Sequence, residues 1–195
     1  MDHTLLHAPL GQSVQYHSEY DAGLLFPISR AEARREIGIQ TSPLPFIGWD
    51  LWNAYEMSWL NLKGLPQVAI LRVRVRCDSL NIIESKSFKL YLNSFNQTRF
   101  GDRQAVLDRL KQDLAAAAAG EIEVLMIDPN LFDFEPLREF EGIDLDQQDV
   151  EIDQYQPERA LLKLASAENT ENVTEELFSR LLKSNCPVTS QPDWA

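Results

Sequence analysis

Within the run Gln67–Cys77, the residues from Leu71 onward alternate strictly between apolar and basic side chains, and this alternation constrains the fold more than any other feature of the chain. In a β-strand, successive side chains point to opposite faces, so the apolar set would face one side and the basic set the other. The apolar members are Leu71, Val73, Val75 and Cys77, and the basic members are Arg72, Arg74 and Arg76. The pattern therefore predicts a half-buried strand in a sheet that is covered on one side only.

The segments around this strand predict further strands. Leu51–Leu60 precedes it across a turn that contains a glycine and a proline, an arrangement typical of a hairpin. Another strand is predicted at Glu121–Ile127, and an acidic one at Asp149–Tyr155. The acidic side chains that recur there with the same period are Asp149, Glu151 and Asp153. We expect them to form ion pairs with the three arginines across the sheet surface, and we favour this over a phosphate-binding role for the arginines.

Two amphipathic helices are predicted between the pairs of strands. The first has Ser85 as its N-cap; the second has its N-cap at Asp102 and stops at Gly120. Their apolar stripes recur at spacings of three and four residues, and consist of Phe88, Tyr91, Leu92 and Phe95 in the first helix and Val106, Leu107, Leu110 and Leu114 in the second. The order ββααββ favours an α+β fold, an antiparallel sheet with two helices on one face.

Charge and composition exclude some classes of function. With 18 basic and 30 acidic residues the formal net charge is −12, whereas binding to nucleic acid or to an anionic membrane needs a basic surface. All 3 histidines lie before residue 18, so we predict no metal site and no Ser-His-Asp triad. The beginning of the chain lacks the order of a signal peptide, no apolar stretch approaches the ~20 residues of a membrane helix, and the cysteines form no CxxC motif. We therefore expect a cytoplasmic protein.

The first segment with residue types suited to chemistry runs from Glu84 to Lys89. A carboxylate directly before a helix is placed to accept hydrogen bonds from a pair of N–H groups on the edge of a ligand. Free backbone N–H groups, the Ser85 hydroxyl and the ammonium groups of Lys86 and Lys89 would suit an anion such as a phosphate. On spacing alone, an ordinary capped helix with a solvated basic turn is the alternative.

The second such segment is Cys186–Trp194. A thiol followed by the carboxylate of Asp193, with two prolines stiffening the span between them, pairs a potential nucleophile with a potential proton donor. The alternatives are a buried cysteine that packs as a small apolar side chain and an aspartate that caps a turn.

Together the two segments resemble one enzyme family. Glu84–Phe95, and Ser184–Cys186 with Gln191–Trp194, are similar to the motifs of the NADPH-dependent 7-cyano-7-deazaguanine reductases, the nitrile reductases of the queuosine tRNA-modification pathway. The closer match is the long, two-module form of that enzyme. The segment Tyr55–Val68 also resembles this form. The likeness covers most of the chain from about Leu44 onward.

The resemblance implies a tunnelling fold (T-fold), whose module has the element order predicted above. It also implies reduction of a nitrile to a primary amine, with consumption of two NADPH. Cys186 would form a covalent thioimide with the nitrile carbon, and Asp193 would be the general acid that protonates the nitrogen. The residues implied to bind small molecules are Ile83, Glu84 and Ser85 for 7-cyano-7-deazaguanine and Ser85 and Lys86 for NADPH.

The chain is expected to have three parts. Residues 1–45 would form an N-terminal arm with one short helix at Ala31–Ile37, residues 46–165 the first T-fold module, and residues 166–195 a linker and the opening segment of a second module. We expect either the first part of a longer two-module protein or a chain whose site is completed by a separate chain, with the site between modules or between the subunits of a homodimer. Two other hypotheses stay open: a purine- or pterin-binding module without redox chemistry, and a structural or interaction fragment.

Overall fold

A computed structural model describes residues 17–39, 43–135, 139–156, 158–161, 163, 173–185 and 190–194. The chain divides into two compact units, Met1–Pro136 and Leu137–Ala195. In the described residues, no helix has the length and apolar character needed to cross a bilayer.

The first unit is built on the antiparallel sheet that the alternation predicts. Strands β2 (Trp49–Leu60) and β3 (Pro66–Arg76) form the expected hairpin, and β5 (Ile122–Ile127) pairs with the other edge of β3. In the turn, the Asn61 side chain accepts hydrogen bonds from the Lys63 and Leu65 amides at 2.9 and 3.0 Å. Gly64 there has a φ of 85°, which glycine adopts without strain. The hairpin prediction is confirmed.

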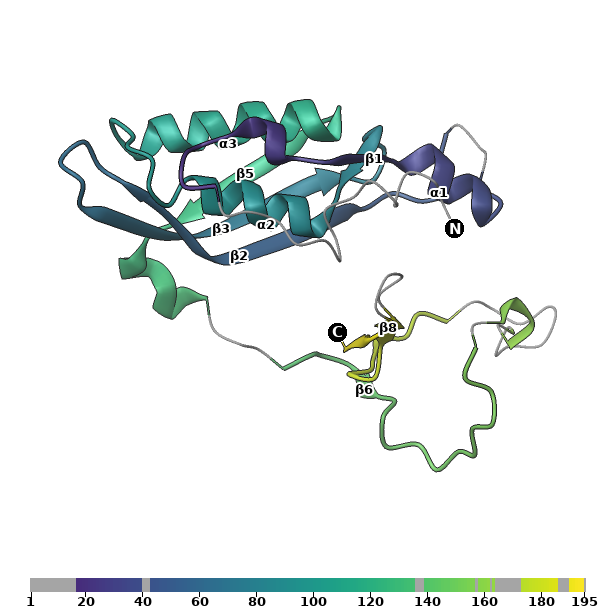
Figure 1. Ribbon diagram of the computed structural model, residues 1–195. Helices are drawn as coiled ribbons and strands as arrows, with labels where there is room; N and C mark the ends of the chain where they lie inside the picture. Colours follow the sequence, from purple (N-terminus) through teal and green to yellow (C-terminus); the bar gives the residue numbers. More distant parts are fainter. Residues whose placement is uncertain are drawn as a thin grey trace. The chain divides into compact units, whose positions relative to one another are not determined.

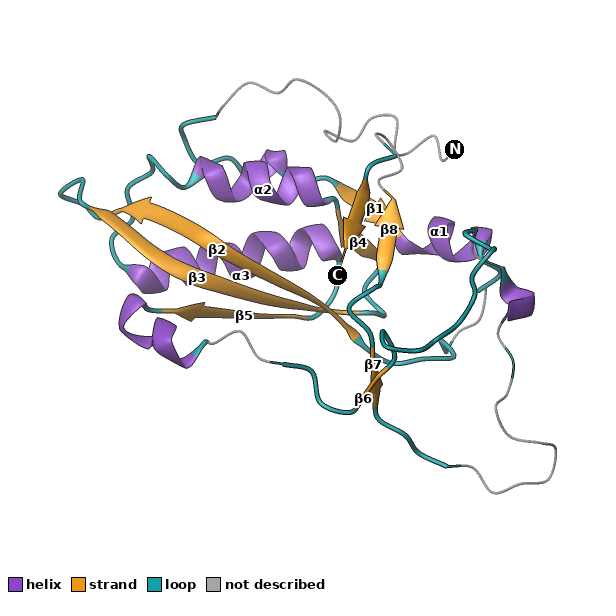
Figure 2. Cartoon of the chain, turned by 90° about the horizontal axis from the view of Figure 1, so that it is seen from below, coloured by secondary structure: helices purple, strands orange, loops and turns teal. Residues whose placement is uncertain are grey.

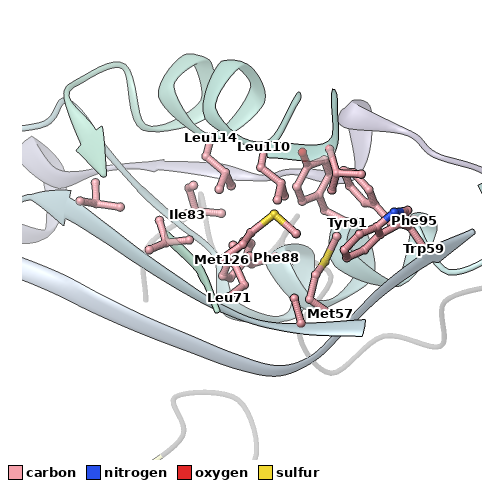
Figure 3. Close-up of a cluster of buried hydrophobic side chains, with 14 of the residues drawn as sticks. Met57, Trp59, Leu71, Ile83, Phe88, Tyr91, Phe95, Leu110, Leu114 and Met126 are labelled. Atoms are coloured by element: carbon pink, nitrogen blue, oxygen red, sulfur yellow. The ribbon is translucent and has the colours of Figure 1, made fainter. Parts of the chain in front are cut away.

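Two helices cover one face of this sheet, as Figures 1 and 2 show from two directions. Helix α2 spans Ser85–Ser94 and α3 spans Arg103–Ala118. Figure 3 shows how their apolar side chains meet those of the sheet. The buried apolar side chains at this interface include Met57, Leu71, Val73, Phe88, Tyr91, Phe95, Val106, Leu110, Leu114 and Met126. The α+β fold class, with its two helices on one face of an antiparallel sheet, is confirmed.

The ends of the helices differ in part from the expectation. Asp102 is the N-cap of α3, as predicted, and accepts from the Ala105 amide at 2.8 Å. The N-cap of α2 is Glu84 and not Ser85, because the longer carboxylate reaches two amides of the first turn. Helix α3 ends at Ala118, and Ala119 takes the left-handed conformation with φ 48°. Gly120 serves a close approach: a Cβ there would lie 2.6 Å from the Ser79 Cβ.

The N-terminal arm is more regular than expected. It contains a 3-10 turn η2 (Ala22–Leu24), a short strand β1 (Pro27–Ser29) and the helix α1 (Arg30–Glu36). The predicted short helix is confirmed, with both of its ends one residue earlier than expected. Strand β1 pairs antiparallel with β4 (Asn81–Ile83) in a separate two-stranded sheet. The alternation rules did not indicate β1 because three residues are too few to show a period.

The described residues of the second unit contain two small strand pairs. Strand β6 (Ile143–Asp144) pairs parallel with β7 (Leu177–Phe178), and β8 (Lys183–Asn185) pairs antiparallel with β9 (Pro192–Trp194). The 3-10 turn η3 (Pro129–Phe134) belongs to the first unit, and η4 (Arg159–Leu161) belongs to the second.

The predicted acidic strand at 149–155 is wrong, and with it the last β of the order ββααββ. These residues are exposed and have no strand assignment. A period of two makes a strand only where another strand offers backbone partners. The expected ion pairs with the arginines are wrong as well, because the arginines pair with acidic residues of the first unit.

Candidate functional site

Glu84 lies at the junction of β4 and α2 and combines burial with charge. Its side chain caps the helix: one carboxylate oxygen accepts from the Lys86 amide at 2.8 Å and the other from the Ser87 amide at 2.6 Å. The residue is only 6% exposed. The positive end of the helix dipole favours the negative charge there. A carboxylate has about four lone-pair sites, and the two amides together with the Ser85 hydroxyl, at 3.5 Å, use three of them, so the carboxylate keeps capacity to accept a further N–H group.

The backbone around Glu84 is held by the arm. The Glu84 amide donates to the Phe26 carbonyl at 2.9 Å, and the Phe26 amide donates to the Ser87 hydroxyl oxygen at 3.0 Å. That hydroxyl in turn donates to the Glu84 carbonyl at 2.7 Å. Ile83, 6% exposed, pairs with Pro27 of β1. Sequence reasoning missed both Phe26 and Ser87; for Ser87 the signal was present, since a serine three residues into a helix often bonds back to the preceding turn.

The start of α2 is less open to an anion than the sequence suggests. We expected free backbone N–H groups, but those of Lys86 and Ser87 are already bonded to Glu84. What remains is the exposed Ser85, whose hydroxyl lies 3.5 Å from the nearer Glu84 oxygen, and the ammonium groups of the half-buried Lys86 and the exposed Lys89. A hydroxyl donor beside two cations still fits a phosphate group.

The three arginines of β3 form surface ion pairs, as favoured, but with partners other than those predicted. Arg74 pairs at 2.8 Å with Glu123, its direct cross-strand neighbour on β5. Arg76 makes two bonds to Asp78, at 2.9 and 2.7 Å, and this guanidinium lowers the pKa of the Asp78 carboxyl. Arg72 bonds to Glu135 at 2.5 Å and to the Asn53 side chain at 3.0 Å.

A groove of about 910 Å³ lies between α1, the segment before β2 and the turn after β3. Arg30, Arg34, Arg76 and Cys77 line it, and Glu84 is not among its lining residues. Three of the four arginines that line the groove bond within the protein: Arg30 to Asp50, Arg34 to the Cys77 carbonyl and Arg76 to Asp78. These bonds account for most of the basic side chains of the groove.

Cys186 and Asp193 fall at the edge of what the structure describes. Cys186 comes directly after β8 in the sequence and lies outside the described residues. Asp193 belongs to β9, where its backbone is the register partner of Ser184, and its side chain is outside the described part. The pairing of this thiol with this carboxylate therefore stays a prediction, as do the three-part division of the chain and the roles of Ile83, Glu84, Ser85 and Lys86.

The chain is similar to known proteins over nearly its whole length. A family model described as "Nitrile reductase, 7-cyano-7-deazaguanine-reductase N-term" matches residues 16–126, which include the sheet, both helices and Glu84. A protein of Albidiferax ferrireducens is 54% identical over 96% of this chain and 69% of its own length, and one of Bordetella avium is 54% identical over 96% and 67%. One of Burkholderia cenocepacia is 52% identical over 96% and 68%. Each of the three is named NADPH-dependent 7-cyano-7-deazaguanine reductase.

The fold and the matched region first place the chain in a class, the nitrile reductases. The matched region contains the antiparallel sheet, the two helices on one of its faces and the capping carboxylate at the start of α2. Within that class, the chain belongs to the family of NADPH-dependent 7-cyano-7-deazaguanine reductases. It spans about two thirds of the length of these relatives.

Proposed function

We propose that this chain acts in the NADPH-dependent reduction of the nitrile of 7-cyano-7-deazaguanine to the primary amine of 7-aminomethyl-7-deazaguanine, a reaction of the queuosine tRNA-modification pathway. The observation that carries the proposal is the buried Glu84 carboxylate, which is fixed by two amides and keeps capacity to accept a further hydrogen bond. Membership of the reductase family supports it independently.

Glu84 would bind the guanine-like edge of the substrate. That edge presents neighbouring ring and exocyclic N–H groups, which match two carboxylate oxygens in spacing and in polarity. Ile83 and Ser85 flank Glu84 in the chain and would contact the same ring system. Because the carboxylate is already held by backbone amides, little side-chain freedom is left to lose when the substrate binds.

Cys186 and Asp193 would carry out the covalent step. The Cys186 thiolate attacks the nitrile carbon, one C–N π bond becomes a nitrogen lone pair, and Asp193 gives that nitrogen a proton to form the thioimide. Two hydride equivalents and the matching protons then reduce the carbon to the amine level and release the thiolate. NADPH supplies those hydrides when it is bound, and Ser85 and Lys86 of this chain would hold it through a hydroxyl and an ammonium group.

The setting of the reaction follows from the same hypothesis. The substrate is a free base, so the enzyme needs no nucleic-acid surface and no membrane, and we propose a cytoplasmic enzyme. We further propose that it works as a homodimer with sites between modules or subunits.

An adduct on Cys186 tests the proposal. The chain, and in parallel the chain joined to the remaining third of the Bordetella avium relative, is incubated with 7-cyano-7-deazaguanine without NADPH, and its intact mass is measured. We expect a gain equal to the mass of the substrate, lost in Cys186→Ala and kept in the matched control Cys77→Ala. NADPH oxidation by the same proteins should then follow substrate addition. Substrate binding without an adduct and without NADPH oxidation would instead indicate a purine-binding module that lacks redox chemistry.

A further inference from the structure

Two buried serines of α2 fasten the N-terminal arm to the helix. Ser87 and Ser94 are both fully buried and lie two helical turns apart, hence on one face. Each hydroxyl donates to the carbonyl three residues before it, at 2.7 Å to Glu84 and 2.6 Å to Tyr91. Each also accepts an amide of the arm, from Phe26 at 3.0 Å and from Asp21 at 3.2 Å. The arm is therefore attached at both ends of α2, and one attachment is at Glu84.

The beginning of the described arm, at Tyr20, is held by a charged group. The Tyr20 hydroxyl donates to an Asp113 carboxylate oxygen at 2.5 Å, and the hydroxyl of the fully buried Tyr91 donates to the same oxygen at 2.8 Å. The Tyr20 amide donates to the Thr98 hydroxyl oxygen at 2.7 Å, and its ring packs edge-on against Phe95. Hydrogen bonds to an ionised acceptor are about twice as strong as neutral ones. Tyr20 is thus held by a charge-assisted bond, an amide bond and ring packing together.

The segment between Tyr20 and Phe26 is short and is itself fixed by hydrogen bonds. Asp21 accepts from the Gly23 amide at 2.8 Å and caps η2, after which the chain reaches Phe26. The Phe26 peptide then bonds on both sides to the Glu84 region, through its carbonyl to the Glu84 amide and through its amide to Ser87. A shift of Tyr20 is therefore transmitted to the residue that orients the Glu84 backbone.

We propose that Tyr20, through its hydrogen bond to Asp113, is a positioning residue for the substrate-binding carboxylate Glu84. This inference rests on the proposed function of Glu84, and it assigns to the arm a part in substrate affinity. Tyr20 itself touches neither substrate nor cofactor in this proposal; it acts through Phe26 and Ser87.

The first test separates positioning from stability by steady-state kinetics. Tyr20→Phe keeps the ring and removes the hydroxyl, and Tyr155→Phe is the matched control because the exposed Tyr155 hydroxyl also donates one hydrogen bond, to the Ile152 carbonyl. Loss of uniform binding raises KM and leaves kcat unchanged. We expect KM for 7-cyano-7-deazaguanine to rise about fivefold in Tyr20→Phe with kcat within about twofold. A lower apparent kcat with unchanged KM would mean that Tyr20 only keeps the protein folded, and would overturn the proposal.

A double-mutant cycle tests the route. Ser87→Ala removes the acceptor of the Phe26 amide and so weakens the connection between Tyr20 and Glu84, because only the bond from the Glu84 amide to the Phe26 carbonyl remains. In the Ser87→Ala background, Tyr20→Phe should change KM less than about twofold, because coupled residues are not additive. Full additivity of the two effects on KM would contradict transmission through the arm.

Hydrogen exchange gives a readout that does not depend on activity. The Glu84 amide, which donates to the Phe26 carbonyl, should exchange about fivefold faster or more in Tyr20→Phe, while the amides of Val106 and Leu110 in the buried face of α3 keep their protection. Unchanged exchange at Glu84 would refute the positioning role. If the unsubstituted enzyme oxidises no NADPH, the proposed function fails, and the exchange experiment still decides whether Tyr20 holds the Glu84 backbone.

Discussion

At the scale of single residues, Glu84 shows how one side chain can serve both a fold and a site. Its carboxylate satisfies two of the amides that every helix start leaves without a partner. The same two bonds fix the orientation of the oxygens that remain available to a ligand. The motif gave the position of the carboxylate, but not the capping role, because glutamate is a less common N-cap than serine and the adjacent Ser85 matched the usual preference.

Replacing Glu84 by glutamine separates the two roles. Glutamine keeps one carbonyl oxygen and loses the charge, so one amide of α2 loses its acceptor and the helix dipole loses its counter-charge. We expect the free energy of unfolding to fall by about 1 kcal/mol and the affinity for 7-cyano-7-deazaguanine to fall by about tenfold or more. Urea unfolding and titration calorimetry measure the two effects. Glu56→Gln, at an exposed position of β2, is the control; unchanged ligand affinity in Glu84→Gln would show that the carboxylate does not contact the substrate.

Tyr20 gives a second residue-scale prediction, on pH. Burial and the hydrogen bond to Asp113 raise the pKa of Tyr20 from 10.0 to about 12, since both disfavour the phenolate. Because the pKa is higher in the folded state than in the unfolded state, the protonated Tyr20 hydroxyl stabilises the folded protein. This contribution to the free energy of unfolding is complete below about pH 10 and is lost as pH rises through about 12. The difference in unfolding free energy between the unsubstituted protein and Tyr20→Phe should therefore shrink over that interval. A constant difference across it would mean that the hydroxyl does not bond to Asp113.

At the scale of elements, the predictions held where a period could be counted and failed where a partner had to be known. The hairpin β2–β3 and the stripes of α2 and α3 follow from alternation and from three-and-four spacing. The strand expected at 149–155 showed the same alternation and is absent, because a strand also needs a neighbour that its own sequence does not specify. Strand β1 is the converse case: its three residues are ordered by β4, and nothing in their own pattern indicates it.

The end of α3 provides a prediction at this scale. A methyl group at Gly120 would meet the Ser79 Cβ at 2.6 Å and its Cα at 2.9 Å, and backbone cannot move aside at little cost. We expect Gly120→Ala to lower the free energy of unfolding by roughly 1–3 kcal/mol, the usual cost of overpacking. Gly101→Ala is the matched control because an added Cβ there meets nothing within 4 Å. Equal stability of the two variants in urea unfolding would show that α3 does not approach the turn after β3 so closely.

At the scale of the whole molecule, the candidate site was readable from motifs in unequal measure. Glu84, Ser85 and Lys86 lie together at the start of one helix, so a short stretch of sequence was enough to group them. Phe26 reaches the same region from the arm, and Tyr20 of the arm contacts Thr98 and Asp113 near the other end of α2; both lie tens of residues away in the sequence, and no local pattern connects them to the site. Such long-range contacts depend on the tertiary packing of the arm against α2 and α3.

The one-sided sheet leads to the last prediction. Leu71 on β3 is fully buried under the helices, whereas Leu125 on the adjacent β5 points to the other face and is 53% exposed. Leu71→Ala should lower the free energy of unfolding of the first unit by about 2–5 kcal/mol, because it removes packed methyl groups and leaves a cavity. Leu125→Ala should stay within about 0.5 kcal/mol, as surface substitutions do. Urea unfolding followed by tryptophan fluorescence measures both, since Trp59 belongs to the same core. A large cost at Leu125 would mean that the outer face of the sheet is covered in the folded protein, because only a buried leucine loses that much on truncation.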